Sequence, residues 1–183
     1  MDASFVGRVY PATEEYQVSR EKIREFADAI GATHPAHRDP GAARALGYPD
    51  VIAPATFAIG ITMRAAEAVI FDPALGLDYT RVVHRDQRFE QRRPLNGADA
   101  VTVEVTVESA KLLAGNAVLG TRADVRDAAG QVVVRAFTTL VARAEPPASG
   151  ADNSPDADSP DADSPHAEDS SSADDSPPAG AGR

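Results

Sequence analysis

The chain has 183 residues and a formal net charge of −10, and this charge is distributed very unevenly along it. Residues 1–144 contain 17 Lys and Arg against 18 Asp and Glu, whereas residues 145–183 contain one Arg against ten acidic residues. The balance in residues 1–144 excludes a basic nucleic-acid-binding surface of the usual kind, and the absence of cysteine excludes disulfides and thiolate metal sites.

The N-terminal residues Met1–Phe5 lack the basic and then apolar order of a signal peptide. No later apolar run approaches the roughly 20 residues that a bilayer span requires. We therefore expect a cytoplasmic protein with no membrane partner and no nucleic-acid partner. Residues 5–18 contain strand-forming residues interrupted by Pro11, which predicts a short and irregular first strand.

Three helices are predicted before residue 71, at residues 20–30, 40–46 and 55–70. Ser19 is a good N-cap for the first helix, and Asp39 followed by Pro40 is a typical start for the second. The helix at 55–70 is apolar on almost every side, which is typical of a helix surrounded by other elements.

Four β-strands are predicted in the second half, at residues 82–95, 100–113, 117–128 and 131–144. Residues 101–108 alternate strictly between valine and a polar residue, the pattern of a strand with one wet face. Turn-forming residues such as Asn96-Gly97 separate the strands, so we expect an antiparallel meander. The fold class is therefore α+β, with a bent antiparallel sheet wrapped around the central apolar helix.

Residues 145–183 contain no Val, Ile, Leu, Met, Phe, Tyr or Trp and carry a degenerate Asp-Ala-Asp-Ser-Pro repeat. Such a segment has no apolar surface to offset the cost of ordering its backbone, about 1–2 kcal/mol per residue. We therefore predict a domain at residues 1–144 and a disordered acidic tail at 145–183.

Three segments carry a family resemblance. The loop Gly31–Asp39 reads G-A-T-H-P-A-H-R-D, residues 51–57 read V-I-A-P-A-T-F, and residues 84–94 read H-R-D-Q-R-F-E-Q-R-R-P. In this order they resemble the loop G-D-x-N-P-x-H-x-D, the entry to the central helix and the H-G-x-Q-x-F…R-P segment of MaoC-type (3R)-hydroxyacyl thioester dehydratases. The chain is also similar to small actinobacterial proteins and to the non-catalytic subunit of the mycobacterial fatty-acid dehydratase. The resemblance implies a single hotdog fold.

The resemblance carries over only part of the family's catalytic machinery. His37 lies at the catalytic histidine position, whereas Ala32 lies where the family has its catalytic aspartate. An alanine can neither transfer a proton nor orient a water by charge. His34 replaces the usual asparagine and is a second, weaker catalytic candidate, because a His34/His37 pair would divide acid and base work only if their pKa values were driven apart. Two histidines without further ligands do not indicate a metal site.

The same resemblance implies substrate-binding positions. The backbone N–H of Ala55, beside Thr56, would meet the thioester oxygen at the start of the central helix. His84 lies on a strand that lines the acyl channel, and Arg93 precedes the family's Arg-Pro turn. A further hypothesis is that arginines of this strand bind the phosphate of a phosphopantetheine carrier, the candidates being Arg85, Arg88, Arg92 and Arg93.

These features imply a subunit of a (3R)-3-hydroxyacyl-ACP or -CoA dehydratase in fatty-acid metabolism, a hydro-lyase that needs no cofactor. It would bind the acyl chain while a MaoC-like partner supplies the Asp/His pair, in a heterodimer or, if the chain is self-sufficient, a homodimer. An alternative is a non-enzymatic module that binds acyl thioesters or an acyl carrier. A thioesterase is a third possibility, in which Glu67 of the central helix would be the carboxylate.

Overall fold

The computed structural model of the chain describes residues 3–143. The predicted domain boundary after Ala144 and the predicted disorder of residues 145–183 lie outside these residues. The longer elements, in chain order, are β1 (Val9–Tyr10), β2 (Tyr16–Gln17), α1 (Arg20–Ala29), α2 (Pro40–Ala45), α3 (Ile59–Ile70), β3 (Val82–Gln91), β4 (Ala100–Leu113), β5 (Asn116–Asp127) and β6 (Val132–Ala142). No helix within residues 3–143 is long and apolar enough to cross a membrane.

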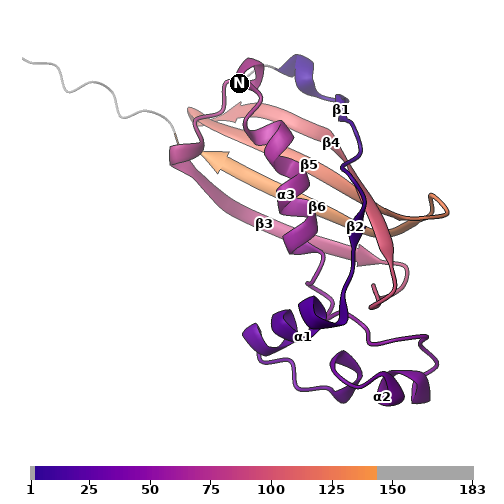
Figure 1. The fold of residues 1–183 in the computed structure, drawn as a ribbon. Coiled ribbons are helices and arrows are strands. Elements are labelled where there is room, and N and C mark those ends of the chain that lie inside the picture. Colours follow the sequence, from indigo (N-terminus) through magenta and orange to yellow (C-terminus); the bar gives the residue numbers. More distant parts are fainter. Residues whose placement is uncertain (1–2, 144–183) are drawn as a thin grey trace, which may run out of the picture. The chain divides into compact units, whose positions relative to one another are not determined.

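The strands form one antiparallel sheet in the order β1-β4-β5-β6-β3, and β2 also pairs with β4 (Figure 1). The expected meander of four consecutive strands is therefore wrong for its first strand, because β3 pairs with β6 and not with β4. The physical reason is that the Asn96-Gly97 turn closes no hairpin. Its backbone pairs with residues 51 and 52 instead, through the Ile52–Asn96 bridge and the bond from Gly97 N–H to the Val51 carbonyl.

The hairpins between β4, β5 and β6 agree with the predicted turns. Leu113 pairs with Asn116 across a two-residue loop in which Ala114 and Gly115 both have positive φ, at 48° and 78°. This backbone matches the right-handed twist of the flanking strands. The three strands it helps to join carry most of the buried valines of the core, including Val101, Val103 and Val105.

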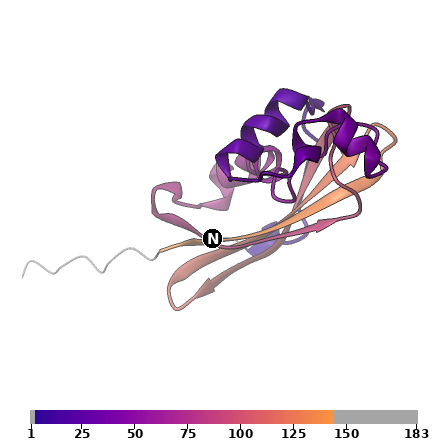
Figure 2. The same ribbon diagram turned by 90° about the horizontal axis from the view of Figure 1, so that it is seen from below.

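Helix α3 lies across one face of the sheet, and α1 and α2 lie on the same side of it (Figure 2). Its buried residues pack against those valines, which explains why an almost wholly apolar helix is stable here. The helix begins at Ile59 rather than at residue 55, because the chain first makes a turn in which Phe57 N–H donates to the Pro54 carbonyl. Ala55 and Thr56 are therefore exposed on that turn.

The N-terminal segment is held at the opposite edge of the sheet from β3. Pro11 splits the predicted strand into β1 and β2, both paired with β4. The Tyr10 hydroxyl donates to Asp72, just beyond α3, at 2.8 Å. Burial together with this carboxylate raises the pKa of Tyr10 to about 12. The segment therefore ties β1 to the end of the central helix.

Candidate functional site

His37 lies in a short 3-10 turn (Pro35–His37), between α1 and α2. Its ring Nδ1 lies 2.7 Å from the carbonyl oxygen of Ile52. Because a carbonyl only accepts, Nδ1 carries the hydrogen, and Nε2 of the neutral ring is left as a hydrogen-bond acceptor. The structure therefore holds His37 in the tautomer that a general base or an acceptor of a ligand hydroxyl requires.

His34 is oriented differently. Its Nδ1 accepts from the Ala36 N–H at 3.1 Å, so the side chain caps the same 3-10 turn and is exposed to solvent. The centroids of the His34 and His37 rings are 5.9 Å apart. Within residues 3–143 no carboxylate hydrogen bonds to either ring, and Asp39 caps α2 by accepting from Gly41 and Ala42.

An apolar groove lies between α3 and the edge strand β3. It has a volume of about 390 Å³. Its lining consists of Thr56, Ile59 and Met63 from the helix side and of His84, Gln87 and Phe89 from the strand side. We call it the β3 groove. The side chain of Gln91 donates to the Ala55 carbonyl at 2.7 Å and ties the end of β3 to the turn before α3.

Two of the predicted substrate-binding residues, Thr56 and His84, line the β3 groove together. Ala55 is next to Thr56 on the exposed turn, and no acceptor within residues 3–143 takes its backbone N–H. The His84 Nε2 lies 3.3 Å from the sulfur of Met63, which is only a weak acceptor. The groove lining therefore includes an imidazole with only a weak hydrogen-bond partner, and a backbone N–H without an acceptor among residues 3–143 lies on the adjoining residue of the turn.

Gln87 and Phe89 also line the groove and were not predicted as site residues. A β-bulge between His84 and Asp86 shifts the strand by one residue, so that His84, Gln87 and Phe89 face the helix together. The Gln87 Oε1 accepts from the Thr138 hydroxyl at 2.8 Å, while its Nε2 is buried and has no hydrogen-bond partner among the described residues. The quoted H-x-x-Q-x-F pattern was the only sequence signal for these two residues.

Arg93 does not face the β3 groove. Its guanidinium donates to both oxygens of Asp99, at 2.7 and 3.0 Å, and reaches Asp127 at 3.4 Å. Asp99 also accepts from the Asn96 N–H, so the ion pair stabilises the turn between β3 and β4. Arg88 stacks on the ring of Phe137 and forms an ion pair with Glu90 of the same strand, so its positive charge is already paired within the sheet.

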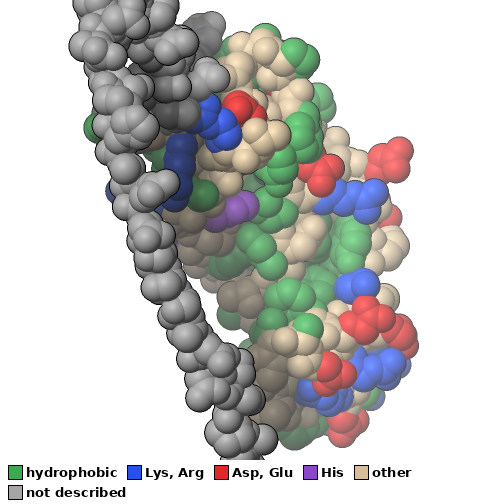
Figure 3. All heavy atoms as spheres, turned by 90° about the vertical axis from the view of Figure 1, so that its left-hand side faces the viewer, with side chains coloured by type: hydrophobic (Ala, Val, Ile, Leu, Met, Phe, Trp, Pro, Cys, Tyr) green, Lys and Arg blue, Asp and Glu red, His purple; other side chains and the backbone are tan. Residues whose placement is uncertain are grey.

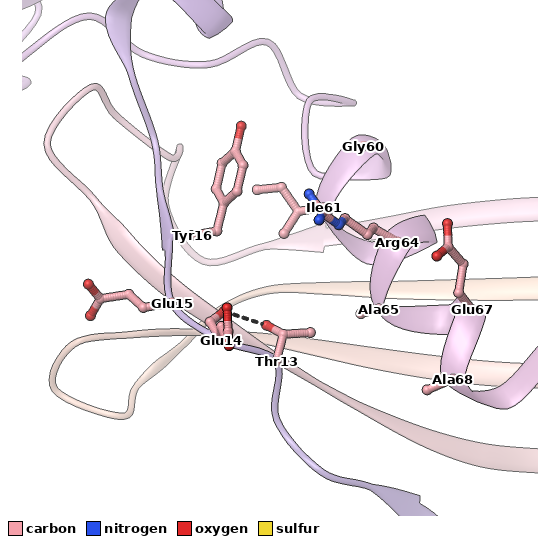
Figure 4. Close-up of a pocket in the computed structure, with 10 residues that line it drawn as sticks. All are labelled: Thr13, Glu14, Glu15, Tyr16, Gly60, Ile61, Arg64, Ala65, Glu67 and Ala68. Atoms are coloured by element: carbon pink, nitrogen blue, oxygen red, sulfur yellow. Dashed lines mark hydrogen bonds between the residues drawn. The ribbon is translucent and has the colours of Figure 1, made fainter.

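A second cavity, of about 470 Å³, lies on the other side of α3, between the helix and residues 13–16 (Figure 4). We call it the β2 cavity. Figure 4 shows Arg64 reaching over Ile61 toward Tyr16, while Glu67 points away from them. Glu67 thus lines a cavity separate from the one that contains Thr56 and His84, which removes the geometric basis for its use as a thioesterase carboxylate at the β3 groove.

The side of the molecule on which β3 lies carries a band of hydrophobic side chains with a histidine among them (Figure 3). Exposed hydrophobic residues near the start of β3 include Phe71, Tyr79 and Val83. Among the described residues no group of three His, Cys, Asp or Glu side chains is placed to hold a metal ion. The chemistry that the β3 groove favours is therefore binding of a largely apolar molecule beside the imidazole of His84.

The chain is similar to known proteins in sequence and in fold. A family model described as FAS1-like, dehydratase domain region, matches residues 4–136. A UPF0336 protein of Streptomyces griseus is 59% identical over 144 residues, which cover 79% of this chain and 96% of the relative. A UPF0336 protein of Saccharopolyspora erythraea is 52% identical over 143 residues, covering 78% and 92% of the two chains.

Solved structures agree with the family match. A MaoC-like dehydratase superposes with a TM-score of 0.71 at 32% identity, covering 77% of this chain but only 43% of its own. The HadBC (3R-hydroxyacyl-ACP dehydratase) complex from Mycobacterium tuberculosis gives a TM-score of 0.65 at 30% identity, covering 75% and 96%. The ChsH1–ChsH2 complex from the same organism, at 20% identity and a TM-score of 0.59, shares the fold. These matches confirm the predicted hotdog fold and the resemblance to MaoC-type dehydratases.

Proposed function

The chain belongs to the FAS1-like dehydratase-region family of MaoC-like hotdog proteins, and from this premise we propose that it is the acyl-binding subunit of a (3R)-3-hydroxyacyl-thioester dehydratase. Its ligand is an acyl-ACP or an acyl-CoA. A MaoC-like partner subunit supplies the aspartate and histidine that complete the reaction. The observation that carries the proposal is an apolar groove together with a loop that holds His37 by its Nδ1 but has alanine at the position of the family's catalytic aspartate.

Within residues 3–143, no carboxylate hydrogen bonds to His37 in place of the missing aspartate. Dehydration of a β-hydroxyacyl thioester removes a proton next to the carbonyl and protonates the departing hydroxyl, so it needs correctly placed acid and base groups. The Ala32 carbonyl accepts a hydrogen bond from the Arg38 guanidinium at 2.6 Å, and the alanine side chain has no proton to transfer. Asp39 is occupied in capping α2. A single subunit therefore lacks half of the acid–base pair.

Two features support a hotdog partner. The strand β3 forms the end of the described sheet, so its outer backbone edge is free to pair with a strand of another subunit. That edge also borders the β3 groove, and a partner placed there would cover the groove. Similar proteins are found in complexes, as with HadBC and ChsH1–ChsH2, or in a chain about twice as long, of which this chain spans 43%.

In the proposed complex each element has a defined role. The apolar residues Ile59, Met63 and Phe89 bind the acyl chain, and burial of each methylene contributes about 0.8 kcal/mol. The Ala55 N–H, at the start of the turn before α3, is the donor for the thioester oxygen. The Nε2 of His37 accepts a hydrogen bond from the substrate and is the proton acceptor that this chain retains.

The test is hydration of a crotonyl thioester by the purified chain, by a MaoC-like protein with an intact G-D-x-N-P-x-H loop, and by the two together. We expect activity only when the MaoC-like protein is present, and a further gain when this chain is added to it. Full activity of the chain alone, abolished by His37→Ala, would overturn the division of labour. Binding of acyl thioesters without any effect on the partner's hydration rate would favour the non-enzymatic binding module.

The variant Ala32→Asp provides a sharper version of this test. Since the fold, the groove and His37 are in place, restoring the carboxylate is expected to give the chain measurable hydratase activity by itself. Ala32→Asn is the matched control, because it adds a polar group of similar size that cannot take a proton. Equal activity of the two variants would contradict the assignment of position 32.

A further inference from the structure

We propose that Asp50 is a positioning residue for His37 and acts through the backbone of Ile52. The role goes beyond acyl binding by the chain, and it rests on the proposed function only for its effect on the ligand. Asp50 lies thirteen positions from His37 in the chain and has no direct contact with its ring. The connection is a short backbone segment, residues 50–53, which we call the strap.

The strap and the His37 turn are joined by two hydrogen bonds. The ring Nδ1–H of His37 donates to the Ile52 carbonyl at 2.7 Å, and the Ile52 N–H donates to the Ala36 carbonyl at 3.0 Å. The peptide group on each side of Ile52 is thus used to hold this turn. The orientation and the tautomer of His37 therefore depend on where the strap lies.

Asp50 holds the strap from one side. Only 8% of this residue is exposed, and its Oδ1 accepts from the Val51 N–H at 2.7 Å. The Arg20 guanidinium, at the start of α1, donates to both carboxylate oxygens of Asp50 at 2.9–3.0 Å. The hydrogen bonds from Arg20 hold the pKa of Asp50 below its usual range, so the carboxylate is charged at neutral pH. Asp50 thereby connects α1 to the peptide that leads into Ile52.

The turn between β3 and β4 holds the strap from the other side. The Gly97 N–H donates to the Val51 carbonyl at 3.0 Å, and the Ala53 N–H donates to the Leu95 carbonyl at 2.7 Å. A Cβ on Gly97 would lie 2.9 Å from the Cγ of Arg20 and 3.2 Å from a methyl of Val51. The turn therefore approaches the Arg20–Asp50 pair so closely that only glycine fits. Because the strap is held on both sides, the Ile52 carbonyl oxygen is kept in one position relative to His37.

The consequence for His37 is specific. A carbonyl fixed at 2.7 Å from Nδ1 makes the Nδ1–H tautomer the favoured neutral form and leaves Nε2 as the acceptor. In a variant without the Asp50 carboxylate, the strap is no longer held on that side. The preference of His37 for the Nδ1–H tautomer then weakens. A purely structural role for Asp50 would lower stability without changing the tautomer of the folded protein. The tautomer is therefore the property that separates the two roles.

The experiment is ¹⁵N NMR of the histidine rings in the full chain at neutral to mildly alkaline pH, with His37 assigned from the spectrum of His37→Gln. In the wild type we expect His37 almost entirely as the Nδ1–H tautomer. In Asp50→Asn we expect the ratio of the two tautomers to shift by roughly tenfold, because the hydrogen bond that favours one form is weakened. An unchanged tautomer in a folded Asp50→Asn protein would overturn the proposal.

The matched control is Asp124→Asn. Asp124 is also a buried carboxylate, 4% exposed, and its oxygens lie between 2.9 and 3.8 Å from the guanidinium nitrogens of Arg122, Arg126 and Arg135 in the sheet. This variant loses a comparable ion pair far from the strap in sequence, so the His37 tautomer should stay as in the wild type. A shift equal to that of Asp50→Asn would show a general loosening and overturn the assignment.

Two further variants keep the test decisive. Arg20→Lys retains the charge but loses the planar two-pronged geometry, and it should give a shift between those of the wild type and Asp50→Asn. If Asp50→Asn does not fold, Arg20→Gln is measured by the same criterion. A wild type with one tautomer that binds no acyl thioester would overturn the proposed function while leaving the positioning role of Asp50 intact.

Discussion

The two cavities beside α3 differ in the polarity of the side chains that line them. The β3 groove is lined by Ile59, Met63 and Phe89 with few polar atoms, whereas the β2 cavity is lined by charged side chains such as Arg64 and Glu67. Water solvates charged walls well, and a charged cavity open to solvent is stable as it is. An apolar groove at a sheet edge gains free energy when a ligand or a partner covers it.

The difference arises from adjacent positions of one helix. Met63 and Arg64 are neighbours in the chain, but successive side chains of an α-helix point about 100° apart. One therefore faces β3 and the other faces β2. Helix α3 is therefore more than a buried core helix, since it separates an apolar surface from a charged one.

The largest expected effect is on ligand binding when the groove is filled. Met63→Trp places a large ring in the β3 groove, and we expect it to weaken binding of dodecanoyl-CoA by about 100-fold, since roughly three to four methylenes lose their burial. Arg64→Trp adds the same ring to the β2 cavity and should change the affinity less than twofold. Calorimetric titration of both folded variants measures this; equal losses would contradict the assignment of the ligand to the β3 groove.

The next effect concerns the stability of the fold at acid pH. The folded-state pKa of Asp50 lies below its unfolded value, so its charged form stabilises the fold at neutral pH. This contribution is present above the unfolded pKa, near 3.9, and is lost as the pH falls through the lower folded pKa. Urea unfolding between pH 6 and pH 3 should therefore show a weaker pH dependence for Asp50→Asn than for the wild type. An equal pH dependence of the unfolding free energy in the two proteins would contradict this expectation.

A smaller effect is expected from the polar pair in the groove wall. The Gln87 Nε2 is buried with no hydrogen-bond partner in the part of the chain that the structure describes, and the Gln87 Oε1 is the acceptor for Thr138. Replacing both residues by apolar ones of similar shape, in Gln87→Met/Thr138→Val, removes the unpaired amide without orphaning the hydroxyl. We expect the free energy of unfolding to stay the same or rise by about 1 kcal/mol.

The single variant Gln87→Met is the control for this pair, because it leaves the Thr138 hydroxyl without its acceptor. It should be less stable than the double variant in the same denaturant titration. A double variant clearly less stable than the wild type would show that the amide contributes to the fold in a way that its contacts do not reveal.

The smallest effect is expected in the β2 cavity. Glu67 is exposed on α3, and its side chain has no hydrogen bond or ion pair within residues 3–143, so Glu67→Gln should change the free energy of unfolding by less than about 0.5 kcal/mol. Any hydrolysis of acyl thioesters by the chain should also be unchanged. Release of the thiol measures this hydrolysis. Its loss in Glu67→Gln would support the thioesterase hypothesis and would show that the β2 cavity takes part in catalysis.

Local features of the fold could be predicted because their causes are local. Ser19 and Asp39 are observed as N-caps, since a short polar side chain before a helix satisfies its free N–H groups. The alternation of residues 101–108 predicted the buried face of β4, and Pro11 predicted the interruption of the first strand. The position of β3 could not be predicted in the same way, because strand order depends on pairing between distant segments.

The alanine at position 32, where the resemblance predicts a catalytic aspartate, is visible in the sequence alone, and no fold can give that side chain an acid. The side chains that form the groove and the contacts that hold His37 follow only from the tertiary structure. Strict alternation along β3 would put His84 and Asp86 on one face, but the bulge between them brings Gln87 and Phe89 to the helix instead. Likewise the tautomer of His37 depends on the carbonyl of Ile52, fifteen residues away, which a pattern of neighbouring residues does not contain.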